Sequence, residues 1–542
     1  MANMWVKKPM SAYEADIKKS ELKRVLGKWS LTAIGIGAII GGGIFVLTGT
    51  GAYYNAGPAL ALSFVVAGIA CVFAALCYAE FASILPVEGS AYAYAYGTVG
   101  EIFAWIIGWG LILEYAMGSM TVAVSWSGYF AKLLKLFGLH LPYWMTTDPG
   151  TARKAFGEAS IQLASADVTP DKLKAVQETI AHYTGAPEIF GMKLFLNLPA
   201  FLIVLLVISI LIRGTKGAAK ANNFIVVLKV TAIIFVIIAG AFFIDVANWT
   251  PFIPAATTIT ENGVSHPAYG FAGIIAGASA IFFAYVGFDA VSTQAGEAIN
   301  PKKDVPFAII ASLVVCTLLY ILVSLVLTGM MHYSDFNPLG KYPDAIKAPV
   351  AYAFEIAGQP WAGYIITVAA TVGLISVLMV MIMGQSRIFL GMSKDGLIPK
   401  TFSKVDAKSG VPRKNLLILG GIISVVAAFT PINELAHMTS FGTLFAFTMV
   451  CVAVWMLRIK EPNLQRNFKV PALPVIAILG ILINVYLIIN LSREAQMYSL
   501  AWLAIGFVIY FLYSKRHSKL RNGGFGETFK AEQQPLEKPD LD

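Results

Sequence analysis

A glycine-rich stretch in the first long apolar run is the clearest candidate binding element of this chain. Residues 35–49 contain six glycines, three of them consecutive at Gly41, Gly42 and Gly43. Three adjacent residues without a Cβ atom make local unwinding of a helix easy. Because unwound backbone at membrane depth is tolerated only where it lines a cavity or is buried in protein, we predict a helix break at residues 39–44 that forms a binding site. The alternative is a tight packing surface, since small residues also let membrane helices approach closely.

A second apolar run is interrupted in a similar way at residues 281–290. Gly287 breaks this run and is followed by the carboxylate of Asp289. Paired glycine-interrupted segments in two halves of a chain are the best sequence indication of a transporter site. The N–H groups that begin a half-helix attract an anion, and the carbonyls freed at a break attract a cation. A ligand that carries both charges close together, such as an α-amino acid, fits this arrangement.

Ionisable residues inside apolar runs are the next candidates, because a charge at membrane depth is costly and is a functional hypothesis by default. Lys229 lies about 12 Å into its run and Glu114 about 22 Å into another, at the rise of an α-helix. Lys229 either titrates during transport or is a structural cation that ties helices together. Glu114 either relays protons or holds a structural network. Five carboxylates near the cytoplasmic ends of runs are expected to contact gates or loops through basic residues such as Arg387: Glu80, Glu88, Asp289, Glu297 and Asp304.

The composition is that of a membrane protein. Of 542 residues, 57% are hydrophobic and 13% are charged, against roughly 25% charged in soluble domains. The net charge of +9 is spread over short loops, so we expect membrane lipids and no nucleic acid as partners. The cysteines fall inside apolar runs, which argues against a disulfide framework or a metal site: Cys71, Cys77, Cys316 and Cys451.

The apolar runs predict an all-α integral membrane protein with twelve transmembrane helices. The two interrupted helices are five spans apart, so the second five-helix unit must run in the opposite sense to the first. We therefore expect a 5+5 inverted repeat followed by two C-terminal helices. The predicted spans are 30–50, 57–85, 99–135, 194–213, 221–247, 269–293, 305–331, 359–391, 413–431, 435–458, 471–491 and 498–514.

Lysine and arginine gather in alternate loops, which predicts that both termini lie in the cytoplasm. We expect the protein in the plasma membrane. Residues 1–29 form a polar, basic cytoplasmic segment without a cleavable signal peptide. The polar residues 136–193 lie on the opposite side, either as a solvated connector, which we favour, or as a small extracellular cap. The predicted units are 30–247 (first repeat), 269–458 (second repeat), 471–514 (last two helices) and 515–542 (a disordered cytoplasmic tail).

In sequence the chain resembles the amino acid–polyamine–organocation superfamily, and closely the bacterial members of its cationic amino acid transporter branch. The resemblance covers nearly the whole chain in order, apart from residues 136–193 and the tail. No single motif identifies the family, but the set of motifs does. They lie at 35–49, 77–82, 86–92, 113–115, 282–289, 297–306, 386–387 and 393–399. The resemblance implies a LeuT-like fold and an amino acid substrate.

The resemblance also implies the site residues. The N–H groups of Gly42, Gly43 and Ile44 would hold the substrate carboxylate, although many relatives have a hydroxyl side chain in place of Gly42. The carbonyls of Ile39, Phe283 and Val286 would accept from the substrate amine. Phe283 would also gate the pocket, and its other expected contributors are Ile40, Glu114, Ala284 and Met381. The ammonium of Lys229 would lie near the carbonyls of Gly37 and Ile40 and near Ser376, where sodium-coupled relatives hold Na⁺, and would couple protons to transport.

The apolar walls Phe283, Ala284 and Met381 favour a small neutral amino acid such as alanine. A cationic substrate, arginine or lysine, remains the alternative if Glu114 faces the pocket, and a non-transporting sensor or a channel on the same scaffold is another. We expect no enzyme, since no metal-ligand cluster, nucleophile elbow or nucleotide-binding loop is present in the sequence. We expect no cofactor, only a proton gradient, and either a monomer or a complex with a small membrane subunit.

Overall fold

The computed structural model describes residues 7–8, 26–84, 90–164, 170–261, 264–293, 295, 298–338, 340–343, 345–406 and 409–522. Glu88, Glu297, most of residues 1–29 and the tail beyond residue 522 lie outside this set.

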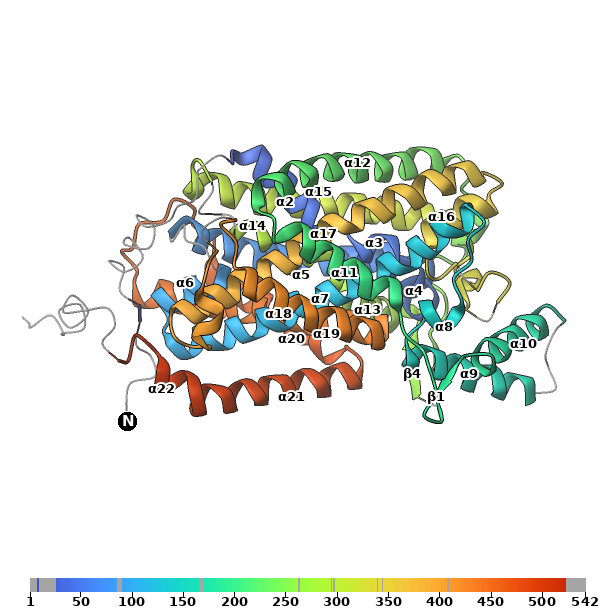
Figure 1. Ribbon diagram of the computed structural model, residues 1–542. Coiled ribbons are helices and arrows are strands. Elements are labelled where there is room, and N and C mark those ends of the chain that lie inside the picture. The colour runs from blue at the N-terminus through green and yellow to red at the C-terminus, as the bar shows by residue number, and fades with distance from the viewer. Residues whose placement is uncertain are drawn as a thin grey trace, which may run out of the picture.

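Long apolar helices run side by side through the molecule (Figure 1). Eight helical segments of the described residues are long and apolar enough to cross a membrane, and α11 and α20 are shorter apolar helices. Each of the twelve predicted spans overlaps a helix, and Thr430 and Pro431 separate the two closest ones. The helices that overlap the other eleven predicted spans are α5 (Leu60–Ile84), α7 (Glu101–Leu136), α11 (Leu198–Leu211), α12 (Thr215–Ala241), α13 (Gly270–Ile281), α15 (Pro301–Met330), α17 (Pro360–Lys394), α18 (Arg413–Phe429), α19 (Ile432–Lys460), α20 (Leu473–Ile489) and α21 (Arg493–Ile509).

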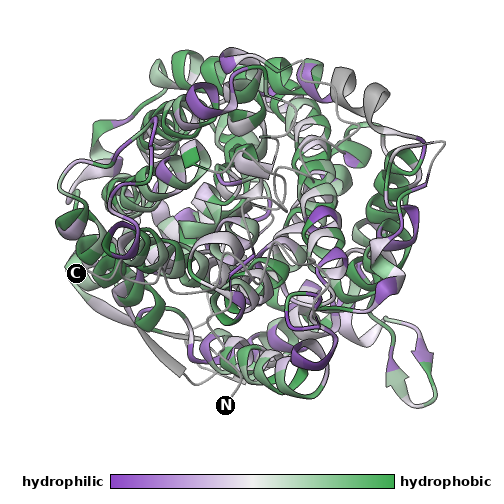
Figure 2. Cartoon of the chain, turned by 90° about the vertical axis from the view of Figure 1, so that its left-hand side faces the viewer, coloured by the Kyte–Doolittle hydropathy of each residue, from purple (hydrophilic) through white to green (hydrophobic). Residues whose placement is uncertain are grey.

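The outer helices turn aliphatic side chains away from the protein. On α11, for example, Ile203 and Val207 are buried, while Leu202, Leu205 and Leu206 are exposed. Seen along the bundle, hydrophobic segments run around its circumference (Figure 2). A helix that is apolar all round is typical of a membrane span, because one side packs against apolar side chains of the protein and the other side faces the lipid chains.

The described residues 136–164 and 170–193 form a small folded unit at one end of the bundle (Figure 1). It contains α8 (Tyr143–Thr146), α9 (Pro149–Ala164), α10 (Pro170–Thr184) and a hairpin of β1 (Glu188–Ile189) and β2 (Met192–Lys193). Tyr183 stacks between Phe156 and Phe195, at ring-centroid distances of 4.3 and 5.3 Å. The described part of this segment is therefore folded, with Phe195 buried and Phe156 and Tyr183 partly exposed. The preference for a solvated connector over an extracellular cap stays a prediction. A second hairpin, β3 (Thr257–Glu261) with β4 (Val264–Ala268), lies at the same end.

The described ends of the chain lie at the opposite end of the bundle (Figure 1). After α21 the chain continues through η8 (Tyr510–Ser514) and α22 (Lys515–His517). Arg521 Nε lies 2.6 Å from Oε1 of the buried Glu101, and Leu520 is also buried. Residues 515–522, which the sequence assigned to a disordered tail, are thus ordered by packing against α7.

Candidate functional site

The first predicted span is broken in the middle. The helix α2 (Lys28–Ile39) ends at Ile39, Ile40 has extended dihedrals, and α3 (Gly42–Phe45) begins two residues later. A further irregularity at Val46 separates α3 from α4 (Leu47–Gly51). The N–H groups of Gly42, Gly43 and Ile44 begin a half-helix, so they have no acceptor inside it. The predicted break is confirmed, and it lies at residues 40–41.

The second predicted break is also present. The helix α13 tightens into a 3-10 turn, η4 (Phe282–Tyr285), and Val286 is extended. Gly287 has a φ of +118°, a conformation that only glycine adopts without strain. The chain then enters α14 (Ala290–Thr293). The N–H of Val286 donates to the carbonyl of Phe283 at 3.1 Å.

The two breaks lie directly against each other, and glycines make this possible. A Cβ atom on Gly43 would overlap the backbone of Ala284, and one on Gly287 would lie 3.0 Å from the backbone of Ala38. Each break thus supplies a glycine that contacts the other break. The packing interpretation is therefore confirmed at Gly43 and Gly287, and the binding interpretation stays a prediction.

Lys229 of α12 lies behind the first break and is fully buried. Its Nζ donates to the carbonyls of Gly37 and Ile40, the latter at 2.9 Å, and to Ser376 Oγ at 3.0 Å. Ser376 in turn donates to the carbonyl of Gly373 at 2.8 Å, so its oxygen is oriented to accept. An ammonium group has three N–H donors, and here all three have neutral acceptors. These are the contacts that the resemblance implies for Lys229; its role in coupling stays a prediction.

Tyr320 of α15 connects the two breaks and was missed by the sequence reasoning. Its hydroxyl lies 2.8 Å from the carbonyl of Ile39 and 2.9 Å from that of Ala284. The carbonyl of Ile39, expected to bind the substrate amine, therefore has a protein partner in this conformation. A signal was present in the sequence, because a tyrosine deep in an apolar span needs an acceptor for its hydroxyl.

One face of α7 forms the wall opposite the breaks. A Cβ atom on Gly118 would lie 3.5 Å from Thr439, 3.7 Å from Met381 Sδ and 3.9 Å from Phe283, so these side chains meet at Gly118. A Cβ on Gly42 would meet the hydroxyl of Ser125, which stands beside the position where many relatives carry a hydroxyl of their own. Glu114 is fully buried one helical turn before Gly118 and on the same face of α7.

The predicted pocket residues are all withdrawn from solvent. The exposed fraction of each side chain is at most 3%: Ile39, Ile40, Ile44, Phe283, Ala284, Val286 and Met381. Charged contacts lie nearer the two ends of the bundle. Lys132 is 2.7 Å from Glu355 of α16 (Pro349–Ile356), and Lys8 is 3.0 Å from Asp395. Access of a ligand to the two breaks therefore requires movement at one end or the other.

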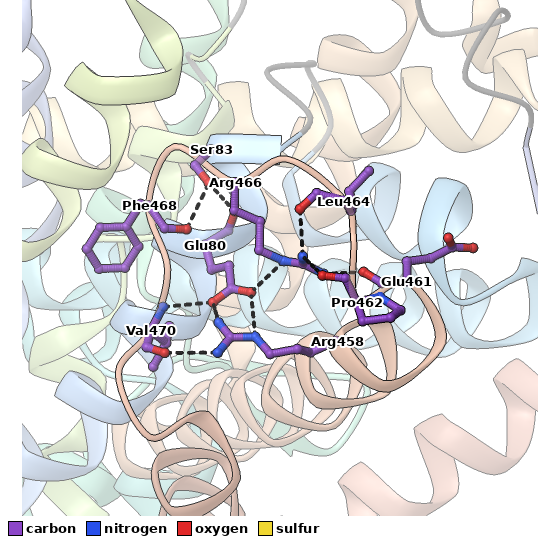
Figure 3. Close-up of polar contacts among 9 residues, drawn as sticks. All are labelled: Glu80, Ser83, Arg458, Glu461, Pro462, Leu464, Arg466, Phe468 and Val470. Carbon is purple, nitrogen blue, oxygen red and sulfur yellow. Dashed lines mark hydrogen bonds and ion pairs between the residues drawn. The ribbon is translucent and has the colours of Figure 1, made fainter.

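The carboxylate of Glu80 makes the expected loop contacts, but with partners other than Arg387 (Figure 3). Its oxygens bind Arg458 at the end of α19, lie 3.1 Å from Arg466 Nε, and accept from the N–H of Val470 at 2.8 Å. Asp289 instead accepts from Tyr115 at 2.8 Å, and Asp304 accepts from the N–H of Asn300 at 3.3 Å. Glu80 thus joins the end of α5 to the α19–α20 connection.

We expect the Glu80→Gln protein to lose thermal stability, because two arginines would keep their charge without a carboxylate. Removing one partner of a buried ion pair costs about 3–5 kcal/mol. The measurement is the temperature at which half of the detergent-solubilised protein aggregates. Glu461→Gln is the matched control, since Glu461 is half-exposed and lies 3.4 Å from Lys7 in a surface pair. Equal midpoints for both variants would contradict the prediction.

Known proteins resemble this chain over most of its length. A family model described as amino acid permease matches residues 26–513. The branched-chain amino acid permease BcaP of Bacillus subtilis is 42% identical over 502 residues, which cover 93% of this chain and 95% of that protein. The methylthioribose transporter of the same organism is 39% identical over 520 residues, covering 96% and 100%. The cationic amino acid transporter 3, mitochondrial, of Arabidopsis thaliana is 35% identical over 442 residues, covering 82% and 63%.

Proposed function

The chain belongs to the amino acid permease family of the amino acid–polyamine–organocation superfamily, and from this premise we propose that it imports neutral amino acids by proton symport across the plasma membrane. The observation that carries the proposal is the contact between two broken helices, with the ammonium of Lys229 against the first. It is a multi-pass membrane protein with a small-molecule substrate, and transport rather than catalysis is the activity of its family.

The proposed architecture is twelve transmembrane helices, built as a 5+5 inverted repeat with two helices added. The order of the two breaks supports it, since they fall in the first and the sixth predicted spans. The proposed orientation has both termini in the cytoplasm. The lysine and arginine distribution supports this, as does the position of residues 136–193 at the end away from the described chain ends.

In the proposed binding mode the substrate carboxylate accepts from the N–H groups of Gly42, Gly43 and Ile44. The substrate amine donates to the carbonyls of Phe283, Val286 and Ile39, of which that of Phe283 also accepts from the N–H of Val286 and that of Ile39 from Tyr320. The Tyr320 hydroxyl has a second acceptor at Ala284. When the substrate amine takes the carbonyl of Ile39, Tyr320 keeps its bond to the other break. Binding would thereby replace one contact between the breaks with two contacts through the ligand.

The proposed substrate has a small or branched aliphatic side chain. Phe283, Met381 and Gly118 border the space that such a side chain would occupy, and none of them offers a charge. The Bacillus subtilis relative, which is named a branched-chain amino acid permease, is in agreement. The second candidate is a cationic amino acid, which the burial of Glu114 on the same face of α7 as Gly118 favours.

Proton coupling is proposed to reside in Lys229. As an ammonium its Nζ donates to three acceptors. They are the carbonyl of Gly37 in α2, the carbonyl of Ile40 directly after α2, and the hydroxyl of Ser376 in α17. A neutral amine has only two N–H donors, so its deprotonation would release one acceptor. Loss of the proton would therefore loosen the first break from α17, which links protonation to movement of the substrate site.

Uptake into proteoliposomes tests this function. We expect saturable accumulation of labelled alanine and leucine when the outside is acidic, and none when a protonophore is present. Unlabelled arginine, lysine and methylthioribose serve as competitors, because relatives are named as transporters of cationic amino acids and of methylthioribose. Competition by arginine alone would support the cationic alternative. Binding without accumulation would support the sensor, and flux without saturation a channel.

We expect the Met381→Ala protein to accept larger side chains, because truncation removes a thioether from the wall beside Gly118. Loss of three side-chain atoms changes relative affinities for substrates by about 1–3 kcal/mol, or roughly 5- to 150-fold in preference. The measurement is the ratio of half-inhibitory concentrations of phenylalanine and alanine. Met383→Ala is the matched control, since Met383 lies two residues further along α17 and faces away. An unchanged ratio in Met381→Ala would contradict the assignment of this wall.

A further inference from the structure

The first span leaves the helix a second time at Val46, beyond the break at residues 40–41. Val46 has a φ of −123° and a ψ of −53° and separates α3 from α4. In a continuous α-helix the N–H of Gly49 would donate to the carbonyl of Phe45, four residues earlier. It donates instead to the carbonyl of Val46 at 3.2 Å, the shorter spacing of a 3-10 turn. The carbonyl of Phe45 is thereby released from the helix.

Tyr129 of α7 binds the released carbonyl. Its hydroxyl donates to the carbonyl of Phe45 at 2.7 Å, and the two rings meet edge to face at a centroid distance of 6.0 Å. Tyr129 is fully buried, so solvent does not compete for this bond. The neighbouring carbonyl, that of Ile44, accepts from Thr48 Oγ1 at 2.9 Å. Both carbonyls at this end of α3 therefore have hydroxyl partners, and the hydroxyl of Tyr129 comes from another helix.

A chain of hydrogen bonds links the Tyr129 hydroxyl to the N–H of Gly43. The carbonyl of Phe45 and the N–H of Val46 belong to one peptide unit, and this N–H donates to the carbonyl of Gly42 at 2.9 Å. The carbonyl of Gly42 and the N–H of Gly43 form the next peptide unit. Hydrogen bonds connected in this way polarise one another. Donation by Tyr129 therefore makes the N–H of Gly43 a stronger donor.

The part of α7 that carries Tyr129 is held in place by a neighbouring helix. Ser127 donates to Asn197 Oδ1 at 2.6 Å, and Asn197 caps the start of α11. Ser125, one turn before Tyr129 on the same face of α7, lies against the other end of α3, where a Cβ atom on Gly42 would meet its hydroxyl. The helix α7 thus contacts α3 at both ends, and the bond from Tyr129 fixes the orientation of this short segment.

We propose that Tyr129 is a positioning residue of the substrate site, whose hydroxyl keeps α3 separate from α4 and directs the N–H of Gly43 at the substrate carboxylate. This role rests on the proposed function, in which that N–H binds the carboxylate. Tyr129 acts through α3 rather than on the amino acid, since its acceptor lies at the far end of α3 from Gly43. Without the hydroxyl, the carbonyl of Phe45 regains the N–H of Gly49 as its partner, α3 joins α4, and the N–H groups at the first break change direction.

Uptake of alanine by the full-length Tyr129→Phe protein in proteoliposomes tests the assignment. We expect the half-saturating concentration to rise about ten-fold, the upper end of the value of one hydrogen bond. The maximal rate should stay that of the parent, as it does when binding alone is weakened. Alanine, valine and leucine should lose affinity by the same factor, because they share the carboxylate and differ in the side chain. A loss that depends on the side chain would show a distorted pocket and overturn the positioning role.

Tyr269→Phe is the matched control. The Tyr269 hydroxyl donates to the carbonyl of Tyr53 at 2.8 Å, a bond of the same kind, and joins the start of α13 to η1 (Ala52–Ala56), away from both paired breaks. Its half-saturating concentration should equal that of the parent. Equal values for Tyr129→Phe and Tyr269→Phe would overturn the role of Tyr129 and leave the proposed function intact. A parent protein that neither binds nor takes up alanine would refute the proposed function, and this role with it.

A second substitution predicts the opposite change with a nearly isosteric side chain. Tyr129→3-fluorotyrosine, introduced by suppression of a stop codon, keeps the ring, and its fluorine withdraws electrons and makes the hydroxyl a stronger donor. We expect a half-saturating concentration about two-fold lower than that of the parent. Elution as a single peak in size exclusion establishes that each variant is folded, and this variant decides the matter if Tyr129→Phe does not fold. An unchanged or higher half-saturating concentration would overturn the role of the hydroxyl.

Discussion

The Lys229→Gln protein is expected to bind its amino acid but to lose accumulation driven by a proton gradient. Lys229 Nζ joins the carbonyl of Ile40 to Ser376 on α17, and only the ammonium form satisfies all three of its acceptors. A hydrogen bond from a charged group contributes about 1.5–3 kcal/mol, so its loss changes the coupled equilibrium by roughly 10- to 150-fold. Glutamine keeps a polar end group, although it is one atom shorter, and it takes up no proton. The measurement is alanine accumulation in proteoliposomes with an inward proton gradient, beside alanine binding in detergent.

Asn222→Leu is the control for this prediction. Asn222 is a buried polar residue seven positions earlier on α12, hence on the same face and two turns away. We expect it to leave gradient-driven accumulation unchanged. Ser376→Ala should weaken accumulation less than Lys229→Gln, because it removes one acceptor of three. Accumulation by Lys229→Gln at the level of Asn222→Leu would refute the coupling role and leave Lys229 as a structural cation.

The helices and their breaks were predictable because the membrane imposes a simple rule. A span must be apolar over about 20 residues, and the backbone leaves the helix only where something else satisfies it. Three consecutive glycines mark the first break and Gly287 marks the second. The contacts of Lys229 followed from the resemblance, since a buried cation needs acceptors and the first break frees them.

Contacts between distant segments were not predictable from the sequence. Nothing in residues 136–193 alone indicates that Tyr183 stacks between two other aromatic rings. Glu80 was recognised as a carboxylate near a helix end, but its partner Arg458 is 378 residues away in the chain. The tail looked polar and weakly structured, yet Arg521 is held by the buried Glu101. Periodicity and composition report on the environment of a segment, and they carry no information about which segment it meets.

The largest effect on substrate binding is expected from Gly43→Val. A Cβ atom at this position would overlap the backbone of Ala284, which no rotamer change relieves. The two breaks would have to separate, and with them the N–H groups and carbonyls proposed to hold the two ends of the amino acid. Overpacking costs about 1–3 kcal/mol, a factor of roughly 5 to 150 in affinity, before the loss of ligand contacts is added. We therefore expect no measurable binding of alanine at millimolar concentration.

Gly421→Val is the matched control for Gly43→Val, since Gly421 lies in the apolar helix α18 and a Cβ atom there meets no atom within 4 Å. It should bind alanine like the parent, and both variants should insert and elute as single species. Gly287→Val provides an independent test of the same contact from the other break, because its φ of +118° and the backbone of Ala38 both oppose a side chain. It should also lose binding. If Gly43→Val bound alanine with the affinity of Gly421→Val, the first break would be a packing surface only. If Gly287→Val alone retained binding, the ligand would be held by the first break without the second, and the proposed paired site would be wrong.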